Sequence, residues 1–257
     1  MFEIEMVSGE TPADDEASMK VSMRASYGTS FAAVEGLLRT FMWLVVAGLT
    51  VALPIPTATA QTAATGTAKP VKLVVLGDSL SAGYGLPAAA AFPVRLQKAL
   101  KDKGIEVEMI NAGVSGDTTS GGLGRLDWSV PEGTQGVIVE LGANDALRGT
   151  DPKVPRAALT EILTRLKARN IAVLLCGMVA PPNYGADYAE KFNSIYPDLA
   201  KQFGVPLYSF FLEGVAGDSK LNQADAMHPT ADGVDIVVKN ILPSVEAFVG
   251  TIAGQRS

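Results

Sequence analysis

The chain contains a single histidine, His228, within an Asp-Ala-Met-His-Pro segment at residues 225–229. Far upstream, Ser79 follows an apolar run in the motif Gly-Asp-Ser-Leu at residues 77–80. A serine hydroxyl is a weak nucleophile that needs a neighbouring base, and imidazole titrates near neutral pH, as such a base must. If imidazole is the base, it has to be His228. With Asp225, these residues supply the parts of a triad for acyl transfer.

The carboxylate of such a triad holds the second ring N–H of the histidine and stabilises the imidazolium. Asp225 lies three residues before His228, so a turn or a helical start brings the two side chains together. Asp232 and Asp235 are also near the histidine, but they fall within an expected helix. We therefore expect Asp225 to be the triad carboxylate, although it also fits an ordinary surface loop.

Acyl transfer passes through an oxyanion, which needs hydrogen-bond donors positioned in advance. We expect three donors: the backbone N–H groups of Ser79 and Gly116, and the side-chain amide of Asn144. Gly116 also fits a turn that needs backbone freedom, and Asn144 also fits a turn or a helix cap. We expect Asp78 to brace the nucleophile loop through backbone N–H groups rather than to act as a base.

From Lys69 onward, short apolar runs alternate with helical patterns. In residues 152–169, for example, leucines and isoleucine recur at positions i, i+3, i+4 and i+7, which indicates a helix. Alternating strands and helices predict a parallel sheet with helices on both faces, and strands that are apolar throughout fit a sheet covered on both sides. The predicted fold is α/β, a three-layer α/β/α sandwich around a five-stranded parallel sheet. The expected strands are 73–76, 107–110, 136–141, 171–176 and 205–208, and the expected helices are 92–103, 118–126, 152–169, 188–203 and 231–249.

Ligands of such sheets bind at the carboxyl ends of the strands. The polar, small and turn-forming residues of this chain gather after the expected strands and before the last helix, at residues 77–79, 111–118, 142–145 and 225–228. This clustering on one rim is the strongest indication of a site that pattern alone gives.

Composition excludes several other classes of function. The chain is 47% hydrophobic with a net charge of −6 and no cluster of basic residues, so we expect no nucleic-acid partner. With one histidine and one cysteine, Cys176, neither a metal site nor an intramolecular disulfide framework is expected. Cys176 lies in an apolar run and is interpreted as a small buried hydrophobe. The glycine-rich segment 120–124 lacks the Lys-Ser/Thr ending of a phosphate-binding loop.

The first part of the chain differs from the rest. Residues 1–36 are predicted to be a disordered extension or a mis-assigned start, with Met19 or Met23 as the alternative starts. Residues 37–60 combine a basic residue, a short apolar stretch and a small-residue site, which indicates a signal peptide cleaved after Ala60; an uncleaved anchor is the alternative. Residues 61–69 form a flexible leader, 70–250 the folded domain and 251–257 a tail. We expect a periplasmic or secreted protein without a stable membrane span after cleavage.

Four separated and ordered motifs resemble the SGNH subgroup of the GDSL esterases and lipases. Residues 77–80 resemble the first block of that family, and residues 113–117 the second, with Gly116 at the oxyanion glycine. Gly-Ala-Asn-Asp at 142–145 resembles the third block, and Asp-x-x-His-Pro at 225–229 the fifth. The similarity is strongest to the periplasmic acyl-CoA thioesterase I, lysophospholipase L1 and arylesterase branch. It implies a flavodoxin-like fold, hydrolysis of acyl esters and thioesters, and no metal or organic cofactor.

The combined expectation is a serine esterase that acts on a small-molecule acyl ester or thioester through an acyl-enzyme. Two alternatives are O-deacetylation of a polysaccharide or glycan on the same scaffold and, more remotely, a non-catalytic lipid- or glycan-binding protein. An apolar groove suits acyl chains, whereas an open rim suits glycans. The expected substrate-binding wall is mostly apolar and consists of Tyr84, Leu86, Leu147, Pro181, Pro182 and Tyr184.

Overall fold

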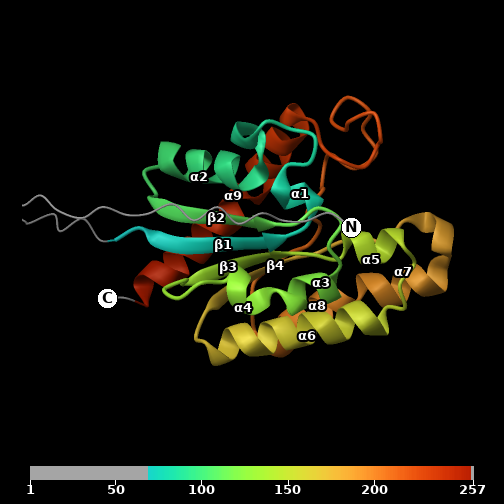
Figure 1. The fold of residues 1–257 in the computed structure, drawn as a ribbon, viewed down its shortest axis with the longest axis horizontal. Coiled ribbons are helices and arrows are strands. Elements are labelled where there is room, and N and C mark those ends of the chain that lie inside the picture. The colour runs from blue at the N-terminus through green and yellow to red at the C-terminus, as the bar shows by residue number, and fades with distance from the viewer. Residues whose placement is uncertain (1–68, 256–257) are drawn as a thin grey trace, which may run out of the picture. The chain divides into compact units, whose positions relative to one another are not determined.

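A computed structural model describes residues 69–255 of the chain. Within them, helices cover both faces of a parallel five-stranded sheet with the order β2-β1-β3-β4-β5 (Figure 1). The predicted three-layer α/β fold is confirmed, and this strand order is the flavodoxin-like one. The expected extension, the signal peptide and all but the last residue of the leader lie outside the described residues. The strands are β1 (Val71–Gly77), β2 (Val107–Gly113), β3 (Gly136–Glu140), β4 (Ala172–Cys176) and β5 (Leu207–Tyr208).

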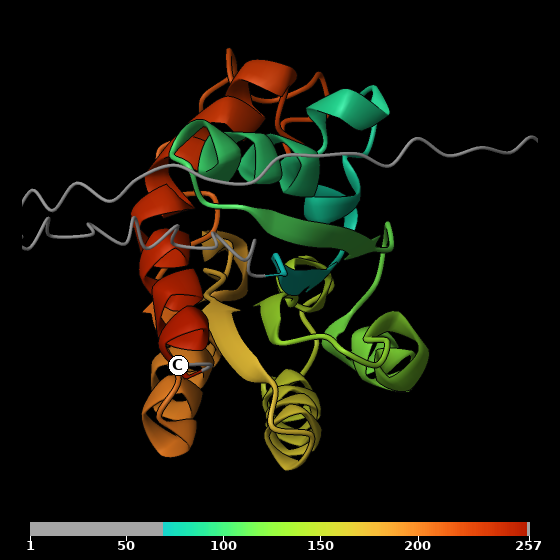
Figure 2. The same cartoon turned by 90° about the vertical axis from the view of Figure 1, so that its left-hand side faces the viewer.

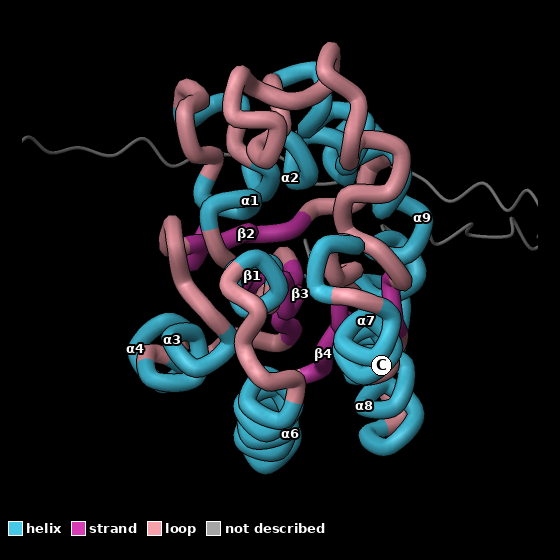
Figure 3. Tube along the Cα trace, turned by 90° about the vertical axis from the view of Figure 1, so that its right-hand side faces the viewer, coloured by secondary structure: helices cyan, strands magenta, loops and turns pink. Residues whose placement is uncertain are grey.

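The strand order reverses at β1, which has β2 on one side and β3 on the other. Gly77, the last residue of β1, is in register with Gly113 of β2 and with Glu140 of β3. Ligands of open α/β sheets bind beyond the carboxyl ends of the strands at such a reversal. Figure 3 is viewed from the carboxyl ends of the strands and shows the loops gathered there. The residues after Gly77 therefore occupy the position at which the fold presents a site.

The helices pack in two layers, seen in Figures 1 and 2. One layer contains α1 (Ser79–Ala82), α2 (Phe92–Asp102) and α9 (Ala231–Gly254), and the other contains α3 (Thr119–Gly124), α4 (Leu126–Ser129), α6 (Lys153–Ala168) and α8 (Ile195–Phe203). Shorter elements lie between the strands and these helices: the 3-10 turns η1 (Ala88–Ala90) and η2 (Pro182–Tyr184), and the helices α5 (Ala143–Leu147) and α7 (Ala186–Asn193).

Two expected helices are broken, and one is longer than expected. The helix expected at 188–203 is divided at Ser194 into α7 and α8, because Pro197 in the first turn of α8 has no N–H to continue the helical bonds. The helix expected at 118–126 ends at Gly124, and α4 follows Arg125. The last helix, α9, continues to Gly254 although it contains Pro243.

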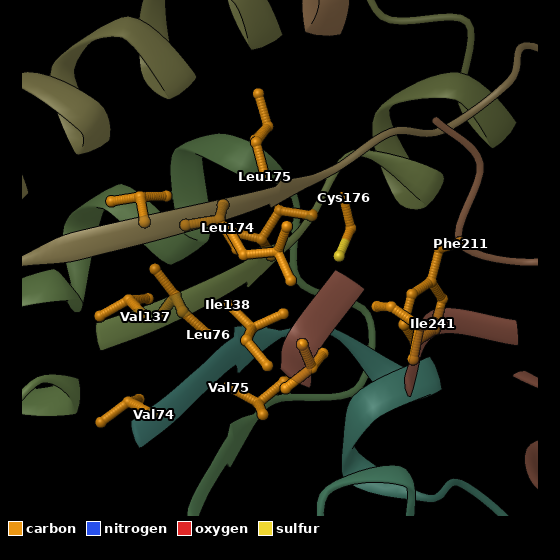
Figure 4. Close-up of a cluster of buried hydrophobic side chains, with 14 of the residues drawn as sticks. Val74, Val75, Leu76, Val137, Ile138, Leu174, Leu175, Cys176, Phe211 and Ile241 are labelled. Carbon is orange, nitrogen blue, oxygen red and sulfur yellow. The ribbon is translucent and has the colours of Figure 1, made fainter. Parts of the chain in front are cut away.

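The core lies on both sides of the sheet and combines the aliphatic strand residues, many of which Figure 4 shows, with the apolar faces of the helices that pack on them. Cys176 is fully buried among them, as predicted. Helix α9 is long and apolar enough to span a membrane by length and composition, but its apolar side chains belong to this core. The expectation that all strands are apolar and covered on both faces is wrong in two places. The edge strand β2 is only partly buried, and β3 ends in the buried acid Glu140.

Candidate active site

Three side chains from remote parts of the chain meet beyond the carboxyl end of β1. Nε2 of His228 lies 2.9 Å from Oγ of Ser79, although the two residues are 149 positions apart. Nδ1 of His228 lies 2.6 Å from Oδ2 of Asp225. With the ring proton on Nδ1, His228 donates to Asp225, and Nε2 is left to accept the proton of Ser79. This arrangement meets the geometric requirement for general-base activation of a serine.

A tight turn presents Asp225 and His228 together. Oδ1 of Asp225 accepts hydrogen bonds from the N–H groups of Met227 and His228, each at 3.0 Å. Ala226, the residue that follows Asp225 in this turn, has a φ of 59°. This left-handed conformation is strained for a residue with a Cβ atom. Hydrogen bonds from the backbone and ring of His228 lower the pKa of Asp225 from 3.8 to about 2. Asp225 is therefore an anion at neutral pH.

Gln223 joins the histidine turn to the loop that follows α1. Its Nε2 donates to the carbonyl oxygens of Tyr84, at 2.7 Å, and of Pro229, at 3.0 Å. Its backbone N–H donates to the carbonyl of His228 at 2.7 Å. The ring of Tyr84 lies against the imidazole of His228, with 4.5 Å between the ring centroids. These contacts confine the orientation of the His228 ring.

Ser79 is the first residue of α1, and Asp78 caps this helix. Oδ1 of Asp78 accepts the N–H of Leu80 at 2.9 Å, which confirms the expected bracing of the nucleophile loop. Oδ2 of Asp78 accepts from Nδ2 of Asn144 at 3.2 Å. At the first position of a helix, the N–H of Ser79 has no intrahelical acceptor. That N–H is available to a group above Ser79.

Of the two other expected oxyanion donors, Asn144 lines the same cavity as Ser79, and Gly116 lies in the loop after β2. Gly116 follows β2 with a φ of +84°, a conformation that favours glycine. Its carbonyl accepts from Nη2 of Arg148 at 2.9 Å. Asn144 in α5 donates from Nδ2 to the carbonyl of Asp117 at 2.9 Å and to Asp78. Both hydrogens of this amide are thus engaged within the protein, which fixes its orientation.

Arg125 is a supporting residue that the sequence analysis missed. It is buried, and its Nε donates to Oδ2 of Asp117 at 2.5 Å. Its Nη1 donates to the carbonyl of Ala112 and its Nη2 to that of Gly77, each at 2.7 Å. One guanidinium therefore connects the ends of β1 and β2 to the loop that holds Asn144. The only sequence signal was a charged residue directly after the glycine-rich segment 120–124.

Glu140 is the second residue that was missed. It is fully buried at the end of β3, where its Oε2 accepts the N–H of Asp78 at 3.3 Å and contacts Oγ of Ser81 at 2.5 Å. Burial, and then the nearby carboxyl of Asp78, raises the pKa of Glu140 well above its ordinary range. Burial also raises the pKa of Asp78 to about 6. The signal in the sequence was an acid within a strand expected to be covered on both faces.

Asp145, which the sequence also places beside the site, serves the packing of helices. Its carboxylate accepts from the N–H of Thr119 at 2.8 Å and from the Thr119 hydroxyl at 3.0 Å. It therefore ties α5 to the start of α3. Burial raises its pKa.

A cavity of about 650 Å³ opens beside Ser79 and His228. Its walls are mainly apolar and come from the loop after β4, from α5 and from the segment between β5 and α9. Among the predicted wall residues, Leu147, Pro181 and Pro182 line it. The other lining residues include Leu80, Met178, Val179, Ala180, Phe210, Leu212, Ala216, Ala226 and Met227. The cavity has the size and character of a small-molecule binding site.

The three remaining predicted wall residues do not line this cavity. Tyr84 lies against the His228 ring instead. Leu86 packs against the hydrophobic core. The hydroxyl of Tyr184 donates to the carbonyl of Leu147 at 2.8 Å. Tyr184 therefore stabilises the position of a residue that lines the cavity. Phe210, Leu212, Ala216 and Met227 in the loops before His228 were missed, since irregular segments carry no periodic pattern that reveals a buried face.

Comparison with known proteins agrees with this geometry. Residues 75–236 match the GDSL-like lipase/acylhydrolase family. The chain is 42% identical over 178 residues to thioesterase 1/protease 1/lysophospholipase L1 of Escherichia coli, covering 67% of this chain and 84% of that protein. It is 43% identical over 159 residues to an arylesterase of Vibrio mimicus, covering 62% and 80%.

Solved structures give the same result. The crystal structure of TesA is 39% identical to this chain, with a TM-score of 0.66 over 69% of this chain and 99% of the other. Taken with the fold, these matches show that the chain belongs to the GDSL-like lipase/acylhydrolase family, in its SGNH group, and is an ester hydrolase.

Proposed function

We propose that the chain is a serine esterase that hydrolyses carboxylic esters and thioesters through an acyl-enzyme. The observation that carries the proposal is the row of contacts from Ser79 through His228 to Asp225, built from segments far apart in the sequence. In this proposal Ser79 is the nucleophile, His228 the general base and acid, and Asp225 the group that holds the ring.

The proposed reaction has two halves. His228 takes the hydroxyl proton as Oγ of Ser79 bonds to the acyl carbon, and the carbonyl oxygen becomes an oxyanion. The imidazolium then returns that proton to the departing alkoxide or thiolate, which leaves an ester on Ser79. Water attacks this ester with His228 again as base, and the acid is released as Ser79 regains its proton.

The proposed oxyanion donors are the N–H groups of Ser79 and Gly116 and the amide of Asn144. Donors held in place before the reaction stabilise the developing charge without a cost of reorganisation. Because both amide hydrogens of Asn144 already have acceptors, one must be shared with the oxyanion. The longer bond, to Asp78 at 3.2 Å, is the one we expect to yield.

The proposed acyl site is the cavity of about 650 Å³. Its apolar walls favour a short or medium acyl chain over a sugar, whose hydroxyls would be left without partners. The contact between Ser79 and His228 also disfavours the alternative of a non-catalytic lipid- or glycan-binding protein. Such a protein has no need of a serine hydroxyl in contact with an imidazole. For the whole protein we propose export to the periplasm or beyond, on the basis of the signal-like segment before Ala60.

Replacement of the nucleophile tests the proposal. Ser79→Ala should lower kcat for p-nitrophenyl acetate by about four orders of magnitude or more, because the triad acts as a unit. Circular dichroism should show an unchanged fold. Ser219→Ala, in an exposed loop, is the matched control and should behave as the wild type. Near-wild-type hydrolysis by purified Ser79→Ala would end the proposal.

A series of p-nitrophenyl esters and acyl-CoA thioesters of increasing chain length then tests the acyl site. Activity should rise while the acyl chain fills the cavity and fall once it exceeds the space. A rate that does not depend on chain length would remove the cavity from the proposal.

A further inference from the structure

Glu140 holds both sides of the nucleophile turn with a single oxygen atom. Its Oε2 accepts the N–H of Asp78, the residue before Ser79, and contacts the hydroxyl of Ser81, two residues after it. We propose that Glu140 is a positioning residue for Ser79, and that it works as an uncharged carboxylic acid. The inference rests on the proposed role of Ser79 as nucleophile.

The surroundings of Glu140 disfavour a charge. The side chain has no exposed surface, and its Oε1 is buried with no hydrogen-bond partner among the described residues. The buried guanidinium of Arg125 donates to the carbonyl of Gly77 and to Asp117, not to Glu140. A buried carboxylate without a cation is costly, and taking up a proton relieves that cost. Burial and Asp78 accordingly raise the pKa of Glu140.

The glycine before the Asp-Ser pair reserves the space for this contact. Gly77 stands in register with Glu140 on the neighbouring strand, and its φ is not positive, so backbone freedom does not explain it. A Cβ atom at Gly77 would collide with the Ser81 hydroxyl and with Oε2 of Glu140. The glycine of the nucleophile motif is therefore required for space, and that space is occupied by the contact between the Ser81 hydroxyl and Glu140.

Ionisation of Glu140 would act on the site through Asp78. The Asp78 carboxylate already holds the N–H of Leu80 and the amide of Asn144. A second negative charge beside it would repel it and loosen the turn that carries Ser79. The protein should therefore lose activity at alkaline pH as Glu140 gives up its proton.

Other titratable groups face this region and have to be separated from Glu140. Cys176 of β4 is in register with it, and Tyr196 of α8 also senses its charge. Burial raises the pKa of both groups well above the ordinary range. His228 interacts electrostatically with Asp78. Only a substitution at Glu140 itself isolates the alkaline effect.

The kinetic test compares Glu140→Gln and Glu140→Leu with the wild type, with Ser79→Ala as the blank and Glu108→Gln, an exposed residue of β2, as the matched control. The amide oxygen of glutamine can accept both bonds without a charge. Glu140→Gln should keep a near-wild-type kcat at neutral pH and lose less activity than the wild type at alkaline pH. Glu140→Leu should lower kcat about 100-fold with little change in KM, as small displacements of reacting groups do.

A spectroscopic test does not depend on activity. The infrared difference spectrum between wild type and Glu140→Gln at neutral pH should show the carbonyl stretch of a protonated, buried carboxyl group. Absence of that band overturns the proposal, as do matching pH profiles of the two proteins. Full activity of Glu140→Leu, or a neutral-pH loss in Glu140→Gln as large as that in Glu140→Leu, overturns it too. Activity that survives in Ser79→Ala would instead refute the proposed function and leave the infrared result standing.

Discussion

Two carboxyl groups flank Ser79, and they differ in almost every respect. Asp225 is on a partly exposed turn, accepts three hydrogen bonds from N–H groups, and has its pKa lowered to about 2. Glu140 is buried in the core, has one oxygen without a hydrogen-bond partner in the described part of the chain, and has its pKa raised well above the ordinary range. Beside Ser79, one carboxyl group, that of Asp225, is therefore ionised, whereas the other, that of Glu140, is protonated.

The comparison shows that burial together with hydrogen-bond donors, and not proximity to Ser79, decides the charge of each group. Three donors stabilise the anion of the partly exposed Asp225, whereas complete burial and the carboxyl group of Asp78 favour the protonated form of Glu140 in spite of the bonds that it accepts from Asp78 and Ser81. Each state suits its place. In the proposed reaction, an anion beside His228 stabilises the imidazolium that forms, while a neutral Glu140 adds no charge near the oxyanion.

Asp225→Asn should have the largest effect, because it removes the anion and leaves the turn in place. The Asn Oδ1 can still accept the N–H groups of Met227 and His228, but its amide presents a donor to Nδ1 and forces the wrong tautomer of the ring. We expect kcat to fall by about four orders of magnitude and the melting temperature at neutral pH to fall as well, because the lowered pKa of Asp225 means that its anion stabilises the folded state. Asp232→Asn, in the first turn of α9, is the control. A loss below tenfold would show that Asp225 has no such role.

Asn144→Ala tests the buried side of the site, which contains Asp78 and Glu140. In this variant, Oδ2 of Asp78 loses the hydrogen bond that Nδ2 of Asn144 donates to it. The variant also loses a proposed oxyanion donor, so kcat should fall by about 100- to 1,000-fold. Asn183→Ala, an exposed position in η2, should leave kcat unchanged. If Asn144→Ala raised KM and left kcat intact, Asn144 would contribute to substrate binding and not to the transition state.

Arg125→Met tests whether the stability of the buried side of the site depends on the guanidinium of Arg125. The change leaves Asp117 and two carbonyl groups without their donor, so the free energy of unfolding should fall by about 3 kcal/mol. Arg165→Met removes a surface ion pair with Glu161 and should have little effect. Urea denaturation of both variants measures the difference, and equal midpoints would contradict the assigned role of Arg125.

The pH dependence of stability should be opposite for the two carboxyl groups. The pKa of Asp225 is lower in the folded state, so its stabilisation is present above the unfolded value of about 4 and is lost as the pH falls toward 2. The pKa of Glu140 is higher in the folded state, so its contribution is present at acid pH and is lost as the pH rises through its folded pKa. The difference in melting temperature between the wild type and Asp225→Asn should shrink toward acid pH. Glu140→Gln should gain on the wild type toward alkaline pH.

Ala226→Gly should have the smallest effect. Glycine relieves the strain of the left-handed conformation, worth roughly 1–2 kcal/mol, but it adds about 0.5–1 kcal/mol of backbone entropy to be lost on folding. A net stabilisation of up to about 1 kcal/mol is expected, measured by thermal unfolding, with kcat near that of the wild type. A marked destabilisation would mean that the Ala226 side chain contributes contacts in the cavity wall that outweigh the strain.

The sequence was most informative where the chemistry is local. Asp225 and His228 lie within four residues, and Ser79 follows an apolar strand directly, so residue type and spacing were enough to name them. The parallel sheet also followed from alternating patterns, since strands covered on both faces leave long apolar runs. The boundaries were less certain, as the break before Pro197 shows.

Glu140 and Arg125 could not be assigned in the same way. Each acts through partners from several segments: Glu140 through Asp78 and Ser81, and Arg125 through the ends of β1 and β2. An isolated charged residue such as Glu140 or Arg125 stands out in the sequence. The partners that stabilise it in the interior are known only once the chain has folded. The cavity wall was partly missed for the same reason, because its loops have no regular period.

The mutual exclusion at Gly77 has a consequence for how this enzyme tolerates change. A methyl group at residue 77 and the carboxyl group of Glu140 cannot occupy the same volume, so the effect of changing one residue depends on the identity of the other. A single-site library at residue 77 would record only losses. The added methyl group would also meet the side chain of Ser81, so alanine at residue 77 becomes acceptable only beside smaller residues at both 81 and 140, and laboratory evolution of this enzyme has to vary the three positions together.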